Sequence, residues 1–419
     1  MQQTRTNQRV VIAGAGVIGV CCAYALAKRG VDVTVCDGRG IGNGASFGNA
    51  GAVAPGHPPL NKPGRIRSAL GTLFDPHSPL FIAPRWTPGL VSWLWRFHRA
   101  GNEYQFNRAM NILALMGRRT SELFDSWIDA ENIDCHYRTE GFYEVFMTPA
   151  GLREAEHEAD IVRGVGYLPS VLDGDQLREL EPHLADSVIG GVHFPESASL
   201  RPYQFVCELA ERAKQHGVRF VDSDIVSITQ IPEEAVCSTA DGNELPTDFV
   251  VVAAGAHSTN LLKPYDVHFP LQAAKGYHRD YQVGSGFFPD LSITCVFGER
   301  SVFCTPMDGF VRLAGTLEFS GVNEVMRPTR LEQLTKAAQK YLKPFGESEP
   351  ISEWCGLRPC LPDGLPAVGP LNRAPNVFVA TGHAMLGMTL GPVTGALISE
   401  WILDEKPSID IGLLDPNRF

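Results

Sequence analysis

The fold is decided by residues 9–37, which read RVVIAGAGVIGVCCAYALAKRGVDVTVCD. Residues 10–13 are a short apolar run, which is typical of a fully buried strand. Residues 17–29 favour a helix, and Gly30 stands where such a helix would end. Residues 31–35 then predict a second strand. A strand, a helix and a strand in this order are typical of a nucleotide-binding α/β unit.

The turn between the first strand and the helix carries the motif G-x-G-x-x-G, formed by Gly14, Gly16 and Gly19. Gly14 permits a tight turn, Gly16 lets the backbone approach a pyrophosphate, and Gly19 lets the helix pack closely on the strand. The first helical residues, Val17 and Ile18, supply unpaired N–H groups at the positive end of the helix dipole. The motif therefore predicts that an anion binds at this helix N-terminus.

An acidic residue, Asp37, follows the second strand eighteen positions after Gly19. It is placed to accept hydrogen bonds from the hydroxyl groups of an adenosine ribose. A glycine-rich loop with no ligand is the alternative, but the complete order of strand, glycines, helix, strand and acid favours a dinucleotide site. Residues 38–51 remain rich in glycine. They are either a linker or, as we favour, a loop that contacts an extended cofactor through Ser46, Asn49 and Gly51.

The bulk composition excludes several classes of protein. The 419 residues suffice for two or three domains, and the net charge of −11 argues against a broad nucleic-acid surface. No stretch of eighteen apolar residues and no signal-peptide pattern occurs, so neither a membrane-spanning helix nor secretion is predicted. The ten cysteines are scattered and predict reduced thiols in a cytoplasmic protein. No cluster of cysteine and histidine has zinc spacing, so we expect no metal site.

Residues 55–100 are rich in proline and in large apolar side chains. Trp86, Trp93 and Trp95 stand among Arg96 and Arg99. The segment is either a proline-punctuated connection with a core helix, which we favour, or a surface that touches a membrane interface through residues 73–100.

The remaining chain shows two kinds of pattern. Residues 141–146 and 271–319 alternate apolar and polar side chains, which predicts an antiparallel sheet. Residues 248–254 instead form an apolar run that predicts a buried parallel strand, and small residues at its end would let a cofactor pass closely. Further helices are predicted at residues 102–130, 202–217 and 330–342, and further strands at 218–221 and 225–228.

The C-terminal part repeats the order of the N-terminal unit. A strand at residues 377–380 leads into a glycine-rich loop at 382–391 and a helix from about residue 393 to 403. This order predicts that a second anionic or electron-rich group lies at that helix N-terminus.

Taken in order, these motifs resemble the D-amino acid oxidase superfamily of FAD flavoproteins, which includes glycine and sarcosine oxidases. The resemblance is carried by the N-terminal fingerprint, the strand ending in Ala253-Ala254-Gly255, Lys275-Gly276-Tyr277, Gly356-Leu357-Arg358-Pro359 with Asp363-Gly364, and Gly382-His383. The loop at 44–51 and the aromatic segment after it look most like bacterial D-amino acid dehydrogenases, with enzymes for D-hydroxyproline a close alternative. The resemblance covers residues 10–403.

The resemblance implies an α/β fold. A Rossmann-like FAD-binding domain is expected from residues 1–60, 196–270 and 354–419. An α+β substrate-binding domain, built on an antiparallel sheet, is expected from residues 61–195 and 271–353.

The resemblance also implies roles for single residues. Arg358 matches the arginine that holds the substrate carboxylate, a task for which a planar guanidinium is suited. Tyr277, Phe303 and, more weakly, His57 are expected to line the substrate pocket. The amides of the turn Gly387, Met388, Thr389 and Leu390 are expected to face the N1–O2 edge of the flavin, where positive potential stabilises the reduced cofactor. Further cofactor contacts are expected at Gly38, Arg39, Ala50, Val226, Ala254, Gly255 and Gly382.

The sequence departs from parts of this superfamily at several positions. Met385 and Phe303 stand where several glycine oxidase-like relatives place an arginine and a tyrosine, which predicts a more apolar pocket and a substrate larger than glycine. Gly356 fills the site at which sarcosine oxidases attach flavin covalently, and Cys355 is one position away, so non-covalent FAD is expected. Asp37 replaces the more usual glutamate.

The expected reaction is oxidation at Cα of a D-amino acid, or of a cyclic imino acid such as D-proline or hydroxy-D-proline, with no side chain as acid or base. Electrons would pass to a quinone or dye rather than to oxygen. The alternatives are a glycine- or sarcosine-type oxidase, a nicotinamide-dependent dehydrogenase, and a flavin-binding subunit without catalysis. We expect a cytoplasmic protein that could also contact the inner face of the membrane.

Overall fold

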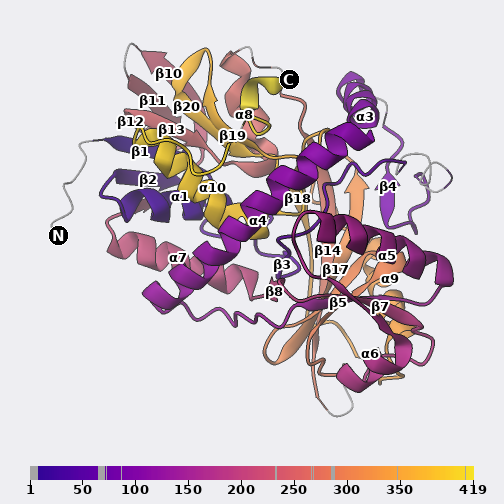
Figure 1. The fold of residues 1–419 in the computed structure, drawn as a ribbon. Coiled ribbons are helices and arrows are strands. Elements are labelled where there is room, and N and C mark those ends of the chain that lie inside the picture. The colour runs from indigo at the N-terminus through magenta and orange to yellow at the C-terminus, as the bar shows by residue number, and fades with distance from the viewer. Residues whose placement is uncertain are drawn as a thin grey trace.

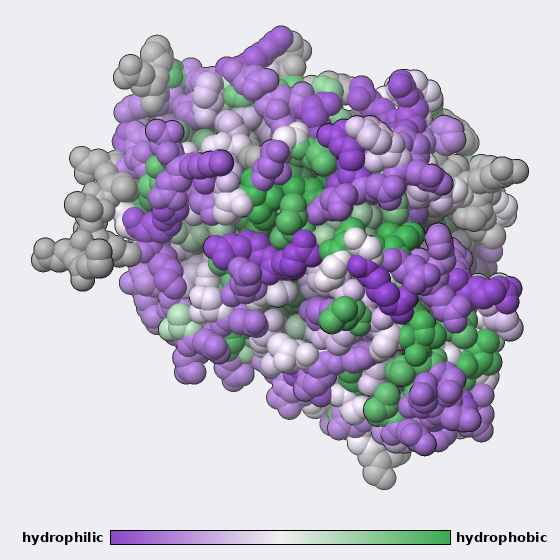
Figure 2. Space-filling model, viewed as in Figure 1, coloured by the Kyte–Doolittle hydropathy of each residue, from purple (hydrophilic) through white to green (hydrophobic). Residues whose placement is uncertain are grey.

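A computed structural model describes residues 8–64, 71, 73–85, 87–231, 234–265, 267, 269–284, 288–346, 348–410 and 412–419. Trp86 lies outside the described residues. Two sheets lie side by side, and one long helix runs across them in the view of Figure 1. On the face shown in Figure 2, hydrophilic side chains predominate and apolar side chains gather in separate patches.

The first sheet confirms the predicted nucleotide-binding unit. Its order is β19-β20-β13-β1-β2-β9, and all neighbours are parallel except β19 and β20. These strands are β1 (Arg9–Ala13), β2 (Asp32–Cys36), β9 (Arg219–Val221), β13 (Phe249–Val252), β19 (Ala367–Leu371) and β20 (Ala374–Thr381). One apolar core joins this sheet to α1 (Val17–Ala27), α7 (Pro202–Gln215) and α10 (Gly387–Ile402).

The other face of this sheet packs on a small antiparallel sheet. That sheet contains β10 (Ile225–Ile231), β11 (Glu234–Thr239) and β12 (Glu244–Thr247), and the short helix α8 (Ser258–Leu262) completes the core. A two-stranded pair, β3 (Ala52–Val53) and β8 (Ala198–Ser199), ties the glycine-rich loop to the start of α7. Short 3₁₀ turns lie at Gly255–His257, Lys263–Tyr265, Gly298–Arg300 and Pro416–Arg418.

The second sheet is mixed rather than wholly antiparallel. Its order is β18-β14-β17-β16-β15-β5-β7-β6, with β4 beside β17, and the pairs β15/β5 and β17/β4 are parallel. Those two pairs join strands that are distant in the chain, so no hairpin turn imposes antiparallel pairing on them. The strands are β4 (Leu80–Ile82), β5 (Phe142–Phe146), β6 (Ser170–Asp173), β7 (Gly190–Phe194), β14 (Gln272–Gln282), β15 (Thr294–Phe297), β16 (Val302–Pro306), β17 (Phe310–Phe319) and β18 (Ser352–Cys360).

The remaining helices are α3 (Pro88–Ala100), α4 (Glu103–Glu131), α5 (Pro149–Gly164), α6 (Gly174–Leu180) and α9 (Pro328–Tyr341). The long helix α4, expected in the substrate domain, buries side chains such as Ile112, Met116 and Phe124 in the same core as α1 and α10. In α3, Leu90, Trp93 and Phe97 are buried, while Val91 and Trp95 are more than half exposed. Every helix in the described part of the chain is too short or too polar to span a bilayer.

The expected boundary at residue 354 falls inside a strand. β18 pairs with β14 along its whole length, from Ser352 opposite Asp280 to Cys360 opposite Gln272. The second sheet therefore continues to residue 360, and β18 carries the chain from it toward the nucleotide-binding sheet.

The last helix begins at Gly387, six residues before the predicted start. Pro392 lies inside α10, whereas proline is normally tolerated only in the first turn of a helix. For this reason the sequence predicts a helix that begins after Pro392. Gly391 and Gly395 let α10 pack closely on α1. A Cβ atom at Gly395 would lie 2.5 Å from the carbonyl oxygen of Cys21. The segment Gly387–Leu390 is thus the first turn of the helix.

Candidate active site

A cavity of about 690 Å³ lies at the carboxyl ends of β1, β2, β13 and β20, where parallel sheets commonly bind ligands. It extends from the glycine motif to β18 and the start of α10. Fourteen of the sequence-predicted site residues line it: Gly14, Gly16, Val17, Ile18, Asp37, Arg39, Ser46, Asn49, Val226, Ala254, Gly255, Arg358, Gly387 and Met388. The cavity therefore joins the nucleotide motif to the predicted substrate arginine.

The glycine motif has the geometry that close approach requires. Gly14 has φ +111°, and a Cβ atom there would lie 2.6 Å from the carbonyl oxygen of Ala253. A Cβ atom at Gly19 would lie 1.9 Å from the carbonyl oxygen of Gly14. At Gly16, by contrast, the nearest atom would be Oγ of Ser46 at 3.4 Å, so this position opens on the cavity.

Two side chains organise the first turn of α1. Oγ of Ser46 accepts a hydrogen bond of 2.9 Å from the amide of Val17. The carboxylate of Asp37 accepts hydrogen bonds from the amides of Ala15 at 2.8 Å and Arg39 at 2.9 Å. Because these contacts hold the loop ends at the helix N-terminus, the cavity forms where the motif predicts an anion.

Several predicted cofactor residues lie beside the cavity and support it. The amide of Gly38 donates to the carboxylate of Asp224, and the carbonyl of Gly51 accepts from the amide of Leu200. The hydroxyl of Thr389 accepts from the amide of Ala54 at 3.1 Å. Gly38, Gly51 and Thr389 do not line the cavity, nor do Gly19, Ala50, Gly382 and Leu390, whereas Asp224 does.

The three residues expected to line the substrate pocket beside Arg358 lie elsewhere. The hydroxyl of Tyr277 donates to Glu318 at 2.8 Å, Phe303 packs on Phe142 with ring centroids 6.1 Å apart, and Nδ1 of His57 lies 2.7 Å from the carbonyl oxygen of Pro58. Strand alternation explains Tyr277, because its neighbour Gly276 occupies the face toward Arg358 and Tyr277 points to the opposite face. Met385 also lies outside the cavity lining and packs against the core beneath α3.

Arg358 is the most informative residue in the cavity. Its Nη1 donates a hydrogen bond of 2.6 Å to the carbonyl of Thr316, and no described carboxylate forms an ion pair with it. Burial lowers the pKa of its guanidinium. A Cβ atom at Gly276 would lie 2.3 Å from that guanidinium, so the glycine makes room for it. Arg358 therefore presents an uncompensated positive charge to the cavity.

The carbonyl that holds Arg358 comes from a distorted strand. Thr316 has φ +63°, which is unfavourable for a β-branched residue. The register between β14 and β17 shifts at this point, from Lys275 opposite Glu318 to Tyr277 opposite Gly315. Such a bulge re-aims backbone groups, and here the carbonyl of Thr316 meets the guanidinium.

Two lining residues, Trp354 and His383, were not predicted as site residues. The ring of Trp354 stacks on His278 at 5.4 Å, and Cβ atoms at Gly48 or Gly356 would lie about 2 Å from its indole. The spacing of those glycines gave no sequence signal, because the two lie 308 positions apart.

The ring of His383 presents an unsatisfied nitrogen in the wall of the cavity. Its Nε2 lies 2.9 Å from Oγ1 of Thr394, whereas its buried Nδ1 has no hydrogen-bond partner among the described residues. Burial lowers the pKa of His383 to about 3, so the ring is neutral. An unpartnered buried nitrogen at this place is suited to a polar ligand atom.

A buried ion pair fastens the glycine-rich loop to the second sheet. Arg312 donates to the carbonyls of Phe47 and Asn49, both at 3.0 Å, and to both carboxylate oxygens of Asp280. His278 adds a contact to the carbonyl of Gly48 at 3.2 Å. These contacts hold the loop against the sheet that carries Arg358.

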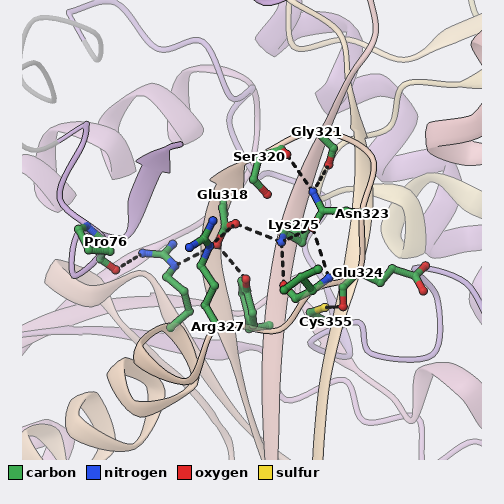
Figure 3. Close-up of polar contacts among 12 residues, drawn as sticks. Pro76, Lys275, Glu318, Ser320, Gly321, Asn323, Glu324, Arg327 and Cys355 are labelled. Atoms are coloured by element: carbon green, nitrogen blue, oxygen red, sulfur yellow. Dashed lines mark hydrogen bonds and ion pairs between the residues drawn. The ribbon is translucent and has the colours of Figure 1, made fainter. Parts of the chain in front are cut away.

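A second group of charged side chains lies beside the cavity, and its members pair with one another (Figure 3). Nζ of the buried Lys275 contacts Glu318 at 3.1 Å, Asn323 at 2.9 Å and the carbonyl of Val325 at 2.8 Å. Nε of Arg327 donates to Glu318 at 3.0 Å. Since Glu324 and Met326 line the cavity, this network fixes the segment that forms one of its walls.

The cavity fits FAD on three observations of this structure: glycines at the turn of a helix N-terminus, an acid at the end of β2, and the unpartnered Nδ1 of His383. No group of three or more metal-binding side chains occurs among the residues that the structure describes.

Comparison with known proteins agrees with this geometry. The chain is 30% identical to "D-amino acid dehydrogenase" of Vibrio atlanticus, covering 98% of this chain and 99% of the relative. It is 31% identical to "D-amino acid dehydrogenase" of Rhizorhabdus wittichii, covering 98% of this chain and 100% of the relative.

Among solved structures, glycine oxidase from Geobacillus kaustophilus matches with a TM-score of 0.80 at 21% identity, covering 99% of this chain and 100% of that one. L-proline dehydrogenase from P. horikoshii matches with a TM-score of 0.77 at 18% identity, covering 99% and 98%. These likenesses establish the fold. The family model described as FAD dependent oxidoreductase matches residues 9–401. With nearly its whole length matched, the chain belongs to the FAD dependent oxidoreductase family.

Proposed function

We propose that this enzyme oxidises a D-amino acid, or a cyclic D-imino acid such as D-proline or hydroxy-D-proline, at Cα. The observation that carries the proposal is Arg358, a cation that lines the cavity without a carboxylate partner among the described residues. A substrate carboxylate would supply that partner. The D configuration is supported by the relatives named D-amino acid dehydrogenase, which align over almost the full chain.

The chain's contribution is binding and orientation. Arg358 would hold the carboxylate through a two-pronged hydrogen bond, which fixes the direction of the Cα–H bond. The second sheet and Trp354 would shield that position from water. FAD would supply the hydride acceptor at that position. Loss of a hydride from Cα of the neutral amine would give an iminium ion, which water would hydrolyse to a 2-oxo acid and ammonium. A cyclic substrate would instead lose a proton from nitrogen and stop at the cyclic imine. No side chain is required as acid or base.

We also propose that FAD is bound without a covalent link. Cys355 lines the cavity, but its thiol donates to the carbonyl of Glu324 at 3.3 Å, and burial raises the pKa of that thiol. A protonated, hydrogen-bonded thiol is a poor nucleophile. Acid precipitation should therefore release all the flavin into the supernatant, and flavin that stays with the pellet would contradict the proposal.

The electron acceptor in this proposal is a quinone or dye rather than oxygen, in keeping with the relatives' name of dehydrogenase. Contact with the inner face of a membrane through residues 73–100 is part of the same proposal. It is supported by the exposed Val91 and Trp95 of α3. A cytoplasmic location is supported by ten cysteines that form no disulfide.

The test is anaerobic bleaching of the flavin by a panel of substrates. The panel contains D-alanine, other D-amino acids, D-proline, cis-4-hydroxy-D-proline, glycine, sarcosine and the L-enantiomers. Bleaching by D-forms is expected, and the fastest identifies the substrate. Readmission of air then shows whether oxygen reoxidises the flavin. Bleaching by glycine or sarcosine alone would instead establish an amine oxidase, and no bleaching would favour a flavin-binding subunit.

A further inference from the structure

A second hollow, of about 490 Å³, opens where α3, the first turns of α4, residues 362–365 and the C-terminal residues meet. Figure 1 shows α3, the start of α4 and the C-terminus at the top of the molecule. We call this site the arginine hollow, since its lining includes Arg96, Arg99, Arg108 and Arg418. It shares no lining residue with the cavity that contains Arg358, so it is a separate site.

Among the described residues, the protein supplies little negative charge to the arginine hollow. Its only acidic lining side chain within the described parts of the chain is Asp363, which already binds Arg418 through contacts of 2.7 and 3.2 Å. Arg96, Arg99 and Arg108 form no ion pair with any carboxylate in the described part of the structure. Within the described structure, these three arginines therefore share one hollow without an ion-pair partner, although the chain has 47 acidic and 36 basic residues.

Aromatic rings rather than carboxylates hold two of these arginines. The guanidinium of Arg99 lies 4.8 Å from the ring centre of Trp95, and that of Arg108 lies 5.5 Å from the ring centre of Tyr104. A cation over a ring is restrained but keeps its charge and most of its hydrogen-bond donors. The buried Nε of Arg96 has no hydrogen-bond partner within the described structure, which is costly unless a ligand supplies one.

We propose that the arginine hollow binds the phosphate group of a phosphomonoester or phosphodiester. A guanidinium fork matches phosphate oxygens in pairs, and three forks around one site suit an anion with several acceptor oxygens. The volume lies within the range of small-ligand sites. The phosphate belongs either to a soluble compound or to the headgroup of a phospholipid. Both sources present the same chemistry to Arg96, Arg99 and Arg108.

The experiment uses the purified enzyme with FAD bound, so that the dinucleotide site is already filled. Binding of inorganic phosphate is measured by titration calorimetry. Binding to vesicles of phosphatidylglycerol, against neutral phosphatidylcholine vesicles, is measured by co-sedimentation. The variants are Arg99→Gln with Arg108→Gln, and Arg96→Gln, and the matched control is Arg153→Gln on α5, which is also exposed and lies outside the hollow.

We expect the wild type to bind at least one probe. The double variant should bind it about tenfold more weakly or worse, and the Arg153 control should be unchanged. Arg99 and Arg108 are exposed, so their replacement leaves folding and the flavin absorbance intact. Binding of inorganic phosphate identifies a soluble ligand as sufficient, and preference for phosphatidylglycerol alone identifies a lipid headgroup. Binding of neither probe, or equal binding by the double variant, would overturn the proposal.

Discussion

Two positive charges on neighbouring strands of the second sheet, the buried Lys275 and the half-buried Arg358, have opposite surroundings. Lys275 on β14 lies opposite Leu357, and Arg358 on β18 lies opposite Ala274. Lys275 contacts Glu318, Asn323 and a backbone carbonyl, whereas Arg358 hydrogen-bonds the carbonyl of Thr316 and has no carboxylate partner in the described structure. Lys275 is paired within the protein, and Arg358 faces a cavity.

This difference in partners distinguishes a cation that stabilises the fold from a cation that is suited to bind a ligand. A buried cation with a carboxylate partner is compensated, so removing the partner destabilises the protein. A cation without such a partner lowers stability in the free protein and gains its counter-charge from a bound anion. Substitutions at the two places should therefore affect different measurements.

The largest expected effect follows from removing the carboxylate of the closed network. Glu318→Ala would leave Lys275 buried without its carboxylate and would also deprive Arg327 and Tyr277 of an acceptor. We expect a loss of about 3–5 kcal/mol in the free energy of unfolding, measured by urea denaturation.

The matched control is Glu318→Gln, which removes the charge but keeps the size of the side chain and one acceptor oxygen. Its loss should be smaller than that of the alanine variant. A loss of about 1 kcal/mol or less in the free energy of unfolding of Glu318→Ala would be no larger than that of an ordinary surface substitution. The network would then not be a main support of this wall of the cavity.

Arg358→Ala should show the reverse behaviour. Losing a two-pronged hydrogen bond to a charged group should lower kcat/KM by about a hundredfold or more. Stability without substrate should be unchanged or slightly higher, because an uncompensated cation has been removed. Steady-state kinetics and thermal unfolding measure the two effects. A large loss of stability with unchanged kinetics would reverse the assignment of the two regions.

The comparison extends to buried histidines and predicts a dependence on pH. Burial, together with the nearby Arg312, lowers the pKa of His278 to about 4, and burial lowers that of His383 to about 3. The unfolded chain binds protons below pH of about 6.5 that the folded chain does not, so stability falls as pH is lowered from there toward 4. Each histidine should lower the free energy of unfolding by about 2 kcal/mol between pH 7 and pH 5.

Urea unfolding at the two pH values measures this effect. His278→Gln should lose less stability on acidification than the wild type. An equal loss in both proteins would mean that His278 is not held neutral.

The smallest expected effect concerns the bulge that supports Arg358. Thr316→Gly should raise the free energy of unfolding by about 1 kcal/mol, because it relieves a left-handed conformation and removes a buried hydroxyl without a hydrogen-bond partner in the described structure. Thr305→Gly is the control, since its hydroxyl is also buried and unpartnered but it lies in the regular strand β16. That control should be destabilised. Equal effects of the two would show that Thr316 is not strained.

Much of the fold was accessible from local sequence. Residues 9–37 predict β1, α1 and β2 within two residues at each end, because the glycines, the apolar runs and the acid all lie within one continuous stretch. The start of α10 was placed wrongly, since a proline at position 392 normally ends or begins a helix. Helix packing on glycines against α1 outweighed that local preference.

The cofactor end of the site was more predictable than the substrate end. The residues from Gly14 to Ser46 lie close in sequence and follow a known spacing, and most of them line the cavity. Tyr277 lies outside the cavity lining because a shift of one position in a strand reverses the face of a side chain. Trp354 was missed because His278 and Gly48 beside it come from distant segments, and only the assembled structure brings them together. His383 contacts Thr394 only eleven positions away, but its place in the cavity wall follows from the assembled structure.

The central claim is that Arg358 binds the carboxylate of the substrate. Its most direct test is the rate of anaerobic flavin bleaching by the best amino acid of the panel and by the matching amine without a carboxylate, in the wild type and in Arg358→Ala. The wild type should prefer the amino acid by about a hundredfold or more, and the variant should lose that preference while keeping its flavin. A variant that still prefers the amino acid as strongly as the wild type would contradict the account.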